Sequence, residues 1–248
     1  MKQAWVVVTG AGSGLGRAMA VHFSQNGFPV LGIGRRLAPL QEIESGSISI
    51  LSADVSEQEG RQAIYDAIPT GDHIKYLIHN AGVLEPIQPL MDVKPADFRK
   101  HMSINLEAPL FCTQMLAPKF QANSTRVLHV SSGAAVSPYE GWGTYCTSKA
   151  ALNMVYRVLD LELKAKGIRV GSVRPGVVDT PMQSVVRSAD EAVFPNLQRF
   201  VDLKESNQLL PPEKVARFMF WLLTETTPDE FAAEEWDIRD DRHQGKWE

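Results

Sequence analysis

Short runs of apolar residues, many of them β-branched, alternate with longer helical patterns along the whole chain. The runs are continuously apolar, as expected for strands that are buried on both faces of a parallel sheet. The predicted strands span residues 4–9, 29–33, 48–51, 74–80, 125–131, 168–174 and 235–238. The predicted helices lie near residues 15–26, 56–68, 95–121, 145–166 and 212–224. This alternation predicts right-handed crossovers and an α/β fold with a doubly wound parallel sheet of the Rossmann type.

No repeat or linker divides the 248 residues, so we expect residues 1–248 to form a single domain. Residues 177–211 are irregular and interrupt the alternation after the sixth strand. Such an excursion at a strand's carboxyl end favours a substrate lid, while a surface subdomain that only packs is the alternative. The charged tail, 239–248, is expected to fray.

Composition excludes several classes of protein. A net charge of −4 gives no electrostatic reason to expect a nucleic-acid partner. Two cysteines, Cys112 and Cys146, suggest no disulfide framework, and six scattered histidines form no metal-binding pattern, so no metal is expected. No run approaches the roughly 18 apolar residues that span a membrane. The apolar run near the amino terminus is too short for a secretory signal. We therefore expect a soluble, cytoplasmic protein.

A glycine-rich turn, Thr9–Gly16, follows the first predicted strand and precedes a helix. Glycines at Gly10, Gly14 and Gly16 would let the backbone approach a pyrophosphate at the helix amino terminus. The strict G-x-G-x-x-G spacing is not met; the pattern is T-G-x-x-x-G-x-G. A plain tight turn is the alternative, but the position between strand and helix favours a dinucleotide site.

The end of the second predicted strand bears on the choice of dinucleotide. An NAD enzyme would carry an acidic residue roughly 20 residues after the glycine turn, to bind the ribose 2′-hydroxyl. This chain instead has Gly34 followed by Arg35 and Arg36. A guanidinium can bind a 2′-phosphate bidentately, so we predict NADP(H) as the cofactor. The alternative, that the arginines only solvate a loop, does not explain the missing acid.

A candidate proton donor is Tyr145, which is spaced i, i+4 from Lys149, so both side chains lie on one face of a helix. The Lys149 ammonium, together with an oxidised nicotinamide, is expected to lower the pKa of the tyrosine towards neutrality. Ser132 lies thirteen residues upstream, at the end of a predicted central strand. Its hydroxyl could hold a carbonyl oxygen. Taken by itself, Ser132 is more typical of a turn residue before Gly133.

On these motifs the chain resembles the short-chain dehydrogenase/reductase family over nearly its whole length. The matching elements are Thr9–Gly16, Asp54, His79-Asn80-Ala81-Gly82, Asn105, Ser132, Tyr145 with Lys149, and Arg174-Pro175-Gly176 with Thr180. One departure is His79, where the family usually has asparagine, at a position peripheral to catalysis.

The resemblance implies roles for these residues. Asp54 and Val55 would meet the adenine, Lys149 would also bind the nicotinamide ribose, and Asn105 would hold a helix open around a proton-relay water. The expected catalytic residues are Asn105, Ser132, Tyr145 and Lys149. The expected cofactor-binding residues are Gly10, Ser13, Gly14, Leu15, Gly16, Arg35, Arg36, Asp54, Val55, Asn80, Ala81, Gly82, Lys149, Pro175, Gly176, Val178 and Thr180.

Three stretches, 132–135, 141–142 and 178–183, are similar to sepiapterin reductases and bacterial benzil reductases. The resemblance implies NADPH-dependent reduction of vicinal dicarbonyls or side-chain ketones, and a homodimer or homotetramer. The substrate would meet Ser132 and Tyr145, and Tyr139, Trp142 and Met182 would line an apolar pocket for a flat ring. Asp237 could anchor the substrate, as a carboxylate does in sepiapterin reductases, or be a surface acid of an edge strand.

The predicted function is therefore that of an NADPH-dependent carbonyl reductase. One alternative is a non-catalytic NADP(H) sensor or scaffold, because the fold is also used for binding. A binding module, however, has no need of Tyr145 with Ser132 and Lys149. The other alternative is an NAD-dependent alcohol dehydrogenase of the same family, against which Arg35 argues.

Overall fold

The structure, a computed structural model, describes residues 2–247 and contains one seven-stranded sheet. All neighbouring strands are parallel, in the order β3-β2-β1-β4-β5-β6-β7. The strands are β1 (Ala4–Thr9), β2 (Val30–Gly34), β3 (Ile48–Ser52), β4 (His73–His79), β5 (Arg126–Val130), β6 (Arg169–Arg174) and β7 (Glu235–Asp237). Each lies at its predicted position to within one or two residues, and the doubly wound fold is confirmed.

Ten α-helices occur within the described residues. They are α1 (Gly14–Gln25), α2 (Leu37–Gln41), α3 (Gln58–Ala67), α4 (Pro95–Met102), α5 (Ala108–Leu116), α6 (Gly143–Lys164), α7 (Pro181–Arg187), α8 (Leu197–Glu205), α9 (Pro212–Thr224) and α10 (Pro228–Ala233). The single helix predicted over 95–121 is divided into α4 and α5. Between the two lies a π-helical segment, Ser103–Glu107.

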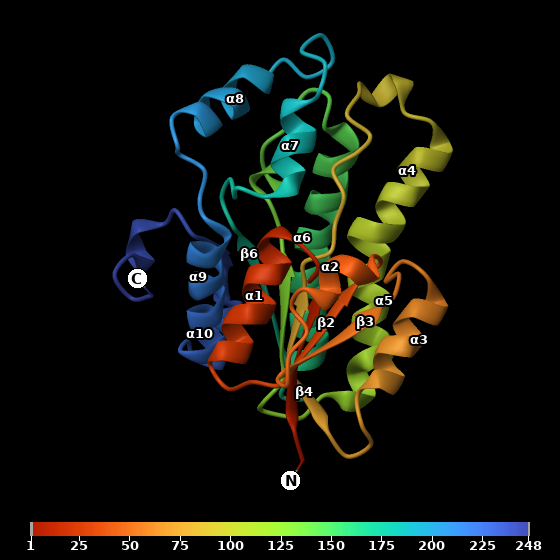
Figure 1. The fold of residues 1–248 in the computed structure, drawn as a ribbon, viewed down its shortest axis with the longest axis vertical. Coiled ribbons are helices and arrows are strands. Elements are labelled where there is room, and N and C mark those ends of the chain that lie inside the picture. Colours follow the sequence, from red (N-terminus) through yellow and green to blue (C-terminus); the bar gives the residue numbers. More distant parts are fainter. Residues whose placement is uncertain (1, 248) are drawn as a thin grey trace.

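Helices cover both faces of the sheet, with α1, α9 and α10 on one side and α3 and α5 on the other (Figure 1). Strand β1 explains this arrangement, because successive side chains of a strand point to opposite faces. Val6 and Val8 pack into the core with α1 and α9, whereas Val7 packs into the core with α3, α5 and α6. The continuous apolar run is therefore needed to bury two layers at once.

Strand β1 lies between β2 and β4, where the winding of the chain reverses. The loops after β1 and β4 therefore leave the sheet towards opposite faces, which opens a crevice at the carboxyl ends of the strands. This switch point places the glycine-rich turn beside the segment that follows β4.

The segment 177–211 is more regular than its sequence indicates, because it contains α7 and α8. Both helices lie above the carboxyl ends of the strands (Figure 1). A separate apolar cluster holds the segment in place. In it the Trp142 ring stacks on Phe194 with ring centroids 4.7 Å apart, and it also contacts Phe200. Aromatic pairs of this kind fix the segment over the crevice.

The expectation that the carboxyl-terminal tail frays is wrong for its described part, up to residue 247. The Trp247 side chain is buried, with its ring centroid 5.1 Å from that of Phe218 in α9. His243 is also buried and contacts the Trp236 ring. These apolar contacts outweigh the charge of the segment and order it against α9.

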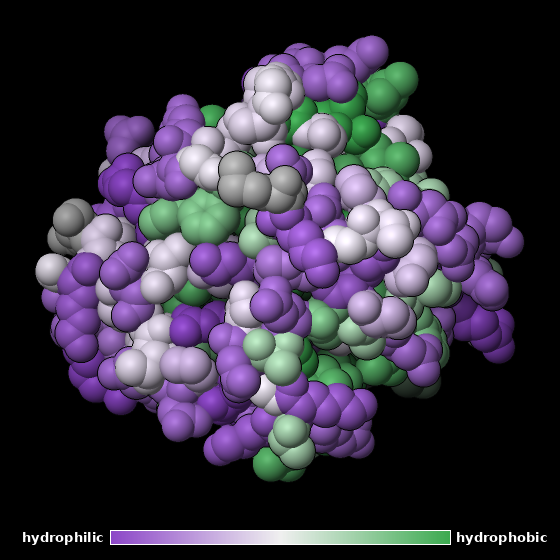
Figure 2. Space-filling view, turned by 90° about the horizontal axis from the view of Figure 1, so that it is seen from below, coloured by the Kyte–Doolittle hydropathy of each residue, from purple (hydrophilic) through white to green (hydrophobic). Residues whose placement is uncertain are grey.

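Polar residues dominate the face that lies below the sheet in Figure 1, with smaller apolar patches between them (Figure 2). No helix within residues 2–247 has the length and apolar character that crossing a membrane requires.

Candidate active site

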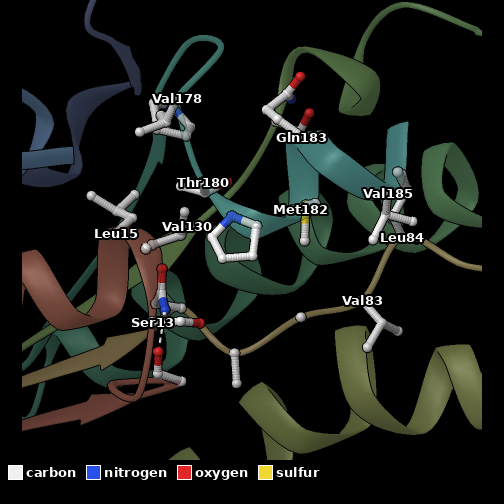
Figure 3. Close-up of a pocket in the computed structure, with 18 of the residues that line it drawn as sticks. Ser13, Leu15, Val83, Leu84, Val130, Val178, Thr180, Met182, Gln183 and Val185 are labelled. Atoms are coloured by element: carbon white, nitrogen blue, oxygen red, sulfur yellow. Dashed lines mark hydrogen bonds between the residues drawn. The ribbon is translucent and has the colours of Figure 1, made fainter. Parts of the chain in front are cut away.

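A cavity of about 480 Å³ lies at the carboxyl ends of the strands. It extends from the glycine-rich turn to the segment with α7 and α8. Ser13 and Leu15 belong to one wall, Val83 and Leu84 to another, and the segment from Val178 to Val185 to a third (Figure 3). Its position is the one in which open α/β sheets bind their ligands.

The glycine-rich turn owes its shape to Asn80, which follows β4. The Asn80 side-chain amide donates to the carbonyl oxygens of Thr9 and Gly10, at 3.0 and 3.3 Å. The Thr9 hydroxyl in turn accepts from the backbone N–H of Asn80 at 3.0 Å. Gly10 and Gly14 have positive φ angles of 71° and 51°, which favour glycine. The turn thus leaves open space above the amino terminus of α1.

Gly16 does not line this space. A Cβ atom at Gly16 would collide with the Gly10 carbonyl and the Asn80 amide. Its glycine is therefore required for close packing of α1 against the turn, as in dinucleotide-binding folds. The turn, the open space and the helix terminus together fit the pyrophosphate of a dinucleotide.

The cavity also extends past the glycine-rich turn to the ends of β2 and β3. Arg35 and Arg36 border it after β2, and Asp54 and Val55 border it after β3. The Arg35 Nη1 atom lies 4.0 Å from the Asp54 carboxylate. Asp54 also accepts hydrogen bonds from the backbone and the hydroxyl of Ser56, at 3.0 and 2.7 Å. The sequence has no acidic residue directly after β2, but Asp54, which follows the neighbouring strand β3, lies beside Arg35.

Ser132, Tyr145 and Lys149 meet in the cavity as predicted. Ser132 follows β5, and its hydroxyl oxygen accepts from the Ala134 backbone N–H at 3.2 Å. Tyr145 and Lys149 lie one turn apart in α6, with the Lys149 Nζ atom 5.7 Å from the centre of the Tyr145 ring. Lys149 also donates to the Val130 carbonyl oxygen at 2.8 Å.

Burial shifts the pKa values of both Tyr145 and Lys149. Removal from water raises the pKa of Tyr145 to about 12, although a hydrogen bond with Ser132 acts in the opposite direction. The expected lowering of the tyrosine pKa therefore does not arise from the protein alone, because desolvation of the phenolate outweighs the hydrogen bond with Ser132. Burial also lowers the pKa of Lys149 to about 8, against the opposing charge of Glu235.

Asn105 does not line the cavity but lies in the π-helical segment beside it, 1% exposed. Its side-chain oxygen accepts from the Val83 N–H, and its amide donates to the Val83 carbonyl, both at 2.8 Å. The amide also lies 2.7 Å from Nε2 of His101. His101 Nδ1 donates to the Glu85 carbonyl at 2.8 Å, so Nε2 of the neutral ring is the acceptor.

These bonds join the helix to the loop after β4, so Asn105 fixes the wall that carries Val83 and Leu84. The widened π turn agrees with the expectation that the helix is opened at Asn105.

The other expected cofactor residues also line the cavity. They are Ala81, Gly82, Pro175, Gly176, Val178 and Thr180. Tyr139, Trp142 and Met182, expected to meet the substrate, line it as well. Nearly all of the site residues predicted from the sequence motifs therefore line the same cavity.

Asp237 is the exception among the predicted substrate residues, because it is not part of the cavity lining. Both of its carboxylate oxygens accept from Arg239, at 2.9 and 2.6 Å, and Arg174 lies 3.5 Å away. A carboxylate already neutralised by two arginines does not fit the expected role of substrate anchor. Arg239 lines the cavity instead.

Several lining residues were not predicted from the sequence, among them Gln183, Arg199, Phe200 and Arg239. Gln183 directly follows Met182 in α7, and that adjacency could have identified it. Arg239 was assigned to the tail and Arg199 belongs to no motif, so neither gave a signal.

Within residues 2–247, no three histidine, cysteine or acidic side chains gather as metal ligands would.

Comparison with known proteins agrees with this geometry. The family model described as short chain dehydrogenase matches residues 4–191. A benzil reductase ((S)-benzoin forming) of Bacillus cereus is 35% identical over 238 residues, which cover 90% of this chain and 96% of the relative. A second benzil reductase, from Bacillus subtilis (strain 168), is 31% identical and covers 89% of this chain and 93% of its own.

Solved structures are similar over nearly the whole fold. The short chain dehydrogenases/reductase YIR035C from Saccharomyces cerevisiae superimposes with a TM-score of 0.90 at 26% identity, covering 98% of this chain and 99% of its own. The closed form of a serine dehydrogenase complexed with NADP+ has a TM-score of 0.78 at 25% identity, covering 90% of each chain.

Proposed function

This chain belongs to the short-chain dehydrogenase family, in its benzil reductase-like branch, and we propose that it is an NADPH-dependent ketone reductase. It is an oxidoreductase that acts on carbonyl groups with a nicotinamide cofactor. The observation that carries the proposal is that Ser132, Tyr145 and Lys149 line the same cavity as the glycine-rich turn.

In the proposed reaction a nicotinamide held in this cavity would supply the hydride that reduces the carbonyl carbon. The Ser132 hydroxyl accepts from Ala134 and keeps its own proton for a carbonyl oxygen or for Tyr145. Tyr145 is protonated at neutral pH, since its pKa is raised to about 12, and it donates the proton that converts the oxygen to a hydroxyl.

Lys149 has three roles in this proposal. Its ammonium stabilises the phenolate that is left after proton transfer, and it binds the nicotinamide ribose. Lys149 would then return a proton to Tyr145 through a water held at Asn105. The hydrogen bonds that fix Asn105 to Val83 support a positioning role for Asn105.

We infer NADP(H) from the end of the cavity that holds Arg35 and Arg36. Two guanidinium groups there favour a 2′-phosphate, which they can bind with charge-assisted hydrogen bonds. Asp54 offsets part of this charge, because it lies 4.0 Å from Arg35. Arg36 adds a second cation.

The substrate proposed is a flat, preferably aromatic, ketone or vicinal diketone. The substrate half of the cavity has aromatic walls, with the Tyr139 and Trp142 rings 5.0 Å apart. Benzil, the compound in the names of two relatives, is an aromatic diketone of this kind. We propose that residues 177–211 act as a lid over it, since Met182 and Phe200 of that segment line the cavity.

We also propose that the protein forms a homodimer, or a tetramer built from it. The outer face of α6 carries three exposed apolar side chains at helical spacing, Met154, Val158 and Leu161, and Phe111 of α5 is exposed as well. A second copy of the same helix would cover this stripe by two-fold symmetry.

The direct test is the initial rate of NADPH oxidation, beside that of NADH, with benzil, 1-phenyl-1,2-propanedione and sepiapterin. We expect turnover with NADPH and formation of benzoin from benzil. If NADPH binds while no carbonyl compound is reduced, the reductase proposal fails and a sensor or scaffold is favoured.

A further inference from the structure

Two arginines from distant segments line the substrate half of the cavity. Arg199 comes from α8 in the proposed lid, and Arg239 comes from the residues just after β7. The Tyr139 hydroxyl lies next to Arg199, whose Nη1 atom donates to it at 3.4 Å. The hydrogen bonds that Arg239 donates to Asp237 raise the pKa of Arg239, and the nearby Tyr139 phenol acts in the same direction to a smaller extent.

Arg199 has no carboxylate partner within residues 2–247, and its side chain is exposed. Its guanidinium lies 5.9 Å from the centre of the ring of the adjacent Phe200. A guanidinium that lines a cavity without a counter-ion keeps its planar set of donors available. Such a group binds a carboxylate or another oxyanion with two parallel hydrogen bonds.

Arg239 is held in a fixed direction. Its Nε and Nη2 atoms donate to Asp237, at 2.9 and 2.6 Å, and Asp237 is held in turn by Arg174. These bonds use one edge of the guanidinium and leave Nη1 for a ligand. Because Asp237 already immobilises the side chain, binding through Nη1 costs little further conformational entropy.

The charges around this part of the cavity favour an anion. Lys149, Arg199 and Arg239 line the substrate half, and among the described lining residues only Glu85 opposes them there. The other lining carboxylate, Asp54, lies at the cofactor end beside Arg35. Because Asp237 offsets the charge of Arg239, the remaining cations are Lys149 and Arg199, which outnumber Glu85 and would attract a negatively charged substrate.

Aromatic rings connect the arginines with the reacting group. Tyr139, beside the arginines, lies 5.0 Å from Trp142, and Trp142 lies 5.8 Å from Tyr145, measured between ring centroids. A substrate with an aromatic ring between its ketone and its anion would pack against these rings.

We propose that the substrate is a ketone with a carboxylate on its far end, and that Arg199 and Arg239 bind this carboxylate beside Tyr139. The inference rests on the proposed carbonyl reduction and adds the chemical class of the substrate.

The test compares benzil with 4-carboxybenzil, which differ by one ionised group remote from the carbonyls. For the full-length protein we expect a KM for 4-carboxybenzil about tenfold below that for benzil, a gain of the size given by hydrogen bonds between charged groups. The substitutions Arg199→Gln and Arg239→Gln should each remove most of this difference. Because both arginines line the cavity, the readout in each variant is the ratio of the KM for benzil to the KM for 4-carboxybenzil.

The control is Arg99→Gln, which removes the same charge from an exposed position on α4 outside the cavity. It should leave the preference for 4-carboxybenzil unchanged. Salt should weaken the preference in the unaltered protein, because ions screen partly exposed charges.

Equal KM values for the two diketones, or a preference that survives both arginine substitutions, would overturn the carboxylate site while benzil reduction still stands. If neither diketone is reduced with NADPH, the proposed function fails, and the substrate class inferred from it fails with it.

Discussion

The ammonium nitrogen of Lys149 lies 2.8 Å from the carbonyl oxygen of Val130 and donates a hydrogen bond to it. Val130 ends β5, two residues before Ser132, so this bond ties α6 to the strand that carries the serine. Tyr145 lies one turn earlier in the same helix. The relative positions of the three side chains are thus fixed by regular secondary structure and one buried hydrogen bond.

The protonation of Lys149 predicts a descending limb in the pH profile of ketone reduction. Because the pKa of Lys149 is lowered to about 8, the ammonium loses its proton as the pH rises through that value. Tyr145 keeps its proton over this range, since its pKa is raised to about 12. We expect kcat/KM to be level below about pH 8 and to fall above it. Cofactor binding and circular dichroism, measured over the same range, control for loss of cofactor or fold. A profile that stays level to pH 10 would show that the ammonium is not required.

Replacing the proton donor should separate chemistry from binding. Tyr145→Phe removes only the hydroxyl, so we expect turnover to fall by about 10²- to 10⁴-fold with little change in the dissociation constant of NADPH. Initial rates and a fluorescence titration of NADPH measure the two quantities. Tyr139→Phe, in the same cavity, should retain most of the activity with benzil. Equal losses in the two variants would contradict the role of Tyr145.

The cofactor preference should depend on Arg35. In the Arg35→Asp variant a carboxylate would repel the 2′-phosphate and could bind a ribose hydroxyl instead, so we expect KM for NADPH to rise at least about tenfold, with NADH becoming the better cofactor. Arg17→Asp is a matched control, because Arg17 pairs with Glu42 and does not line the cavity. An unchanged preference for NADPH in the Arg35 variant would refute the assignment.

The oligomeric state should depend on the outer face of α6. Met154→Glu puts a charge into the exposed apolar stripe, where its desolvation would weaken a symmetric contact, so we expect dissociation to monomers in analytical ultracentrifugation. Met91→Glu, at a side chain that is 95% exposed outside this helix, should leave the assembly intact. A wild-type protein that sediments as a monomer would disprove the dimer.

The stability of the fold should depend on an ion pair far from the active site. Asp160 in α6 accepts two hydrogen bonds from Arg169 in β6, at 3.0 and 3.1 Å, and the two side chains are only 14% and 10% exposed. Asp160→Ala would leave the guanidinium nearly buried with only the exposed Asp229, so we expect unfolding in urea to become easier by about 3 kcal/mol. Glu162→Ala, an exposed change in the same helix, should alter stability by less than about 0.5 kcal/mol. Equal effects would mean that the pair contributes nothing.

The sheet could be predicted from the sequence because its strands are buried on both faces and read as unbroken apolar runs. The helices were harder to predict. The π-helical segment Ser103–Glu107 divides the helix expected over 95–121, and its cause is the tertiary contact of Asn105 with Val83. Helices α7 and α8 are short and form against Trp142, Phe194 and Phe200, so local periodicity alone did not reveal them.

The catalytic set could be predicted because its members belong to local motifs, such as the i, i+4 pair of Tyr145 and Lys149. The substrate half could not, because it is assembled from segments far apart in sequence. Asp237 and Arg239 illustrate this, since both are charged and two residues apart. Only the structure distinguishes the arginine that lines the cavity from the carboxylate that it neutralises.

The central claim, that this chain transfers hydride to a ketone, is tested most directly by an isotope. NADPH deuterated at C4 of the nicotinamide, on each face in turn, is incubated with the protein and benzil, and the benzoin formed is analysed by mass spectrometry. We predict that one of the two labelled cofactors transfers deuterium to the carbinol carbon, and that the Tyr145→Phe variant forms labelled product at least about 100-fold more slowly. Binding of NADPH without label in any product would contradict the claim.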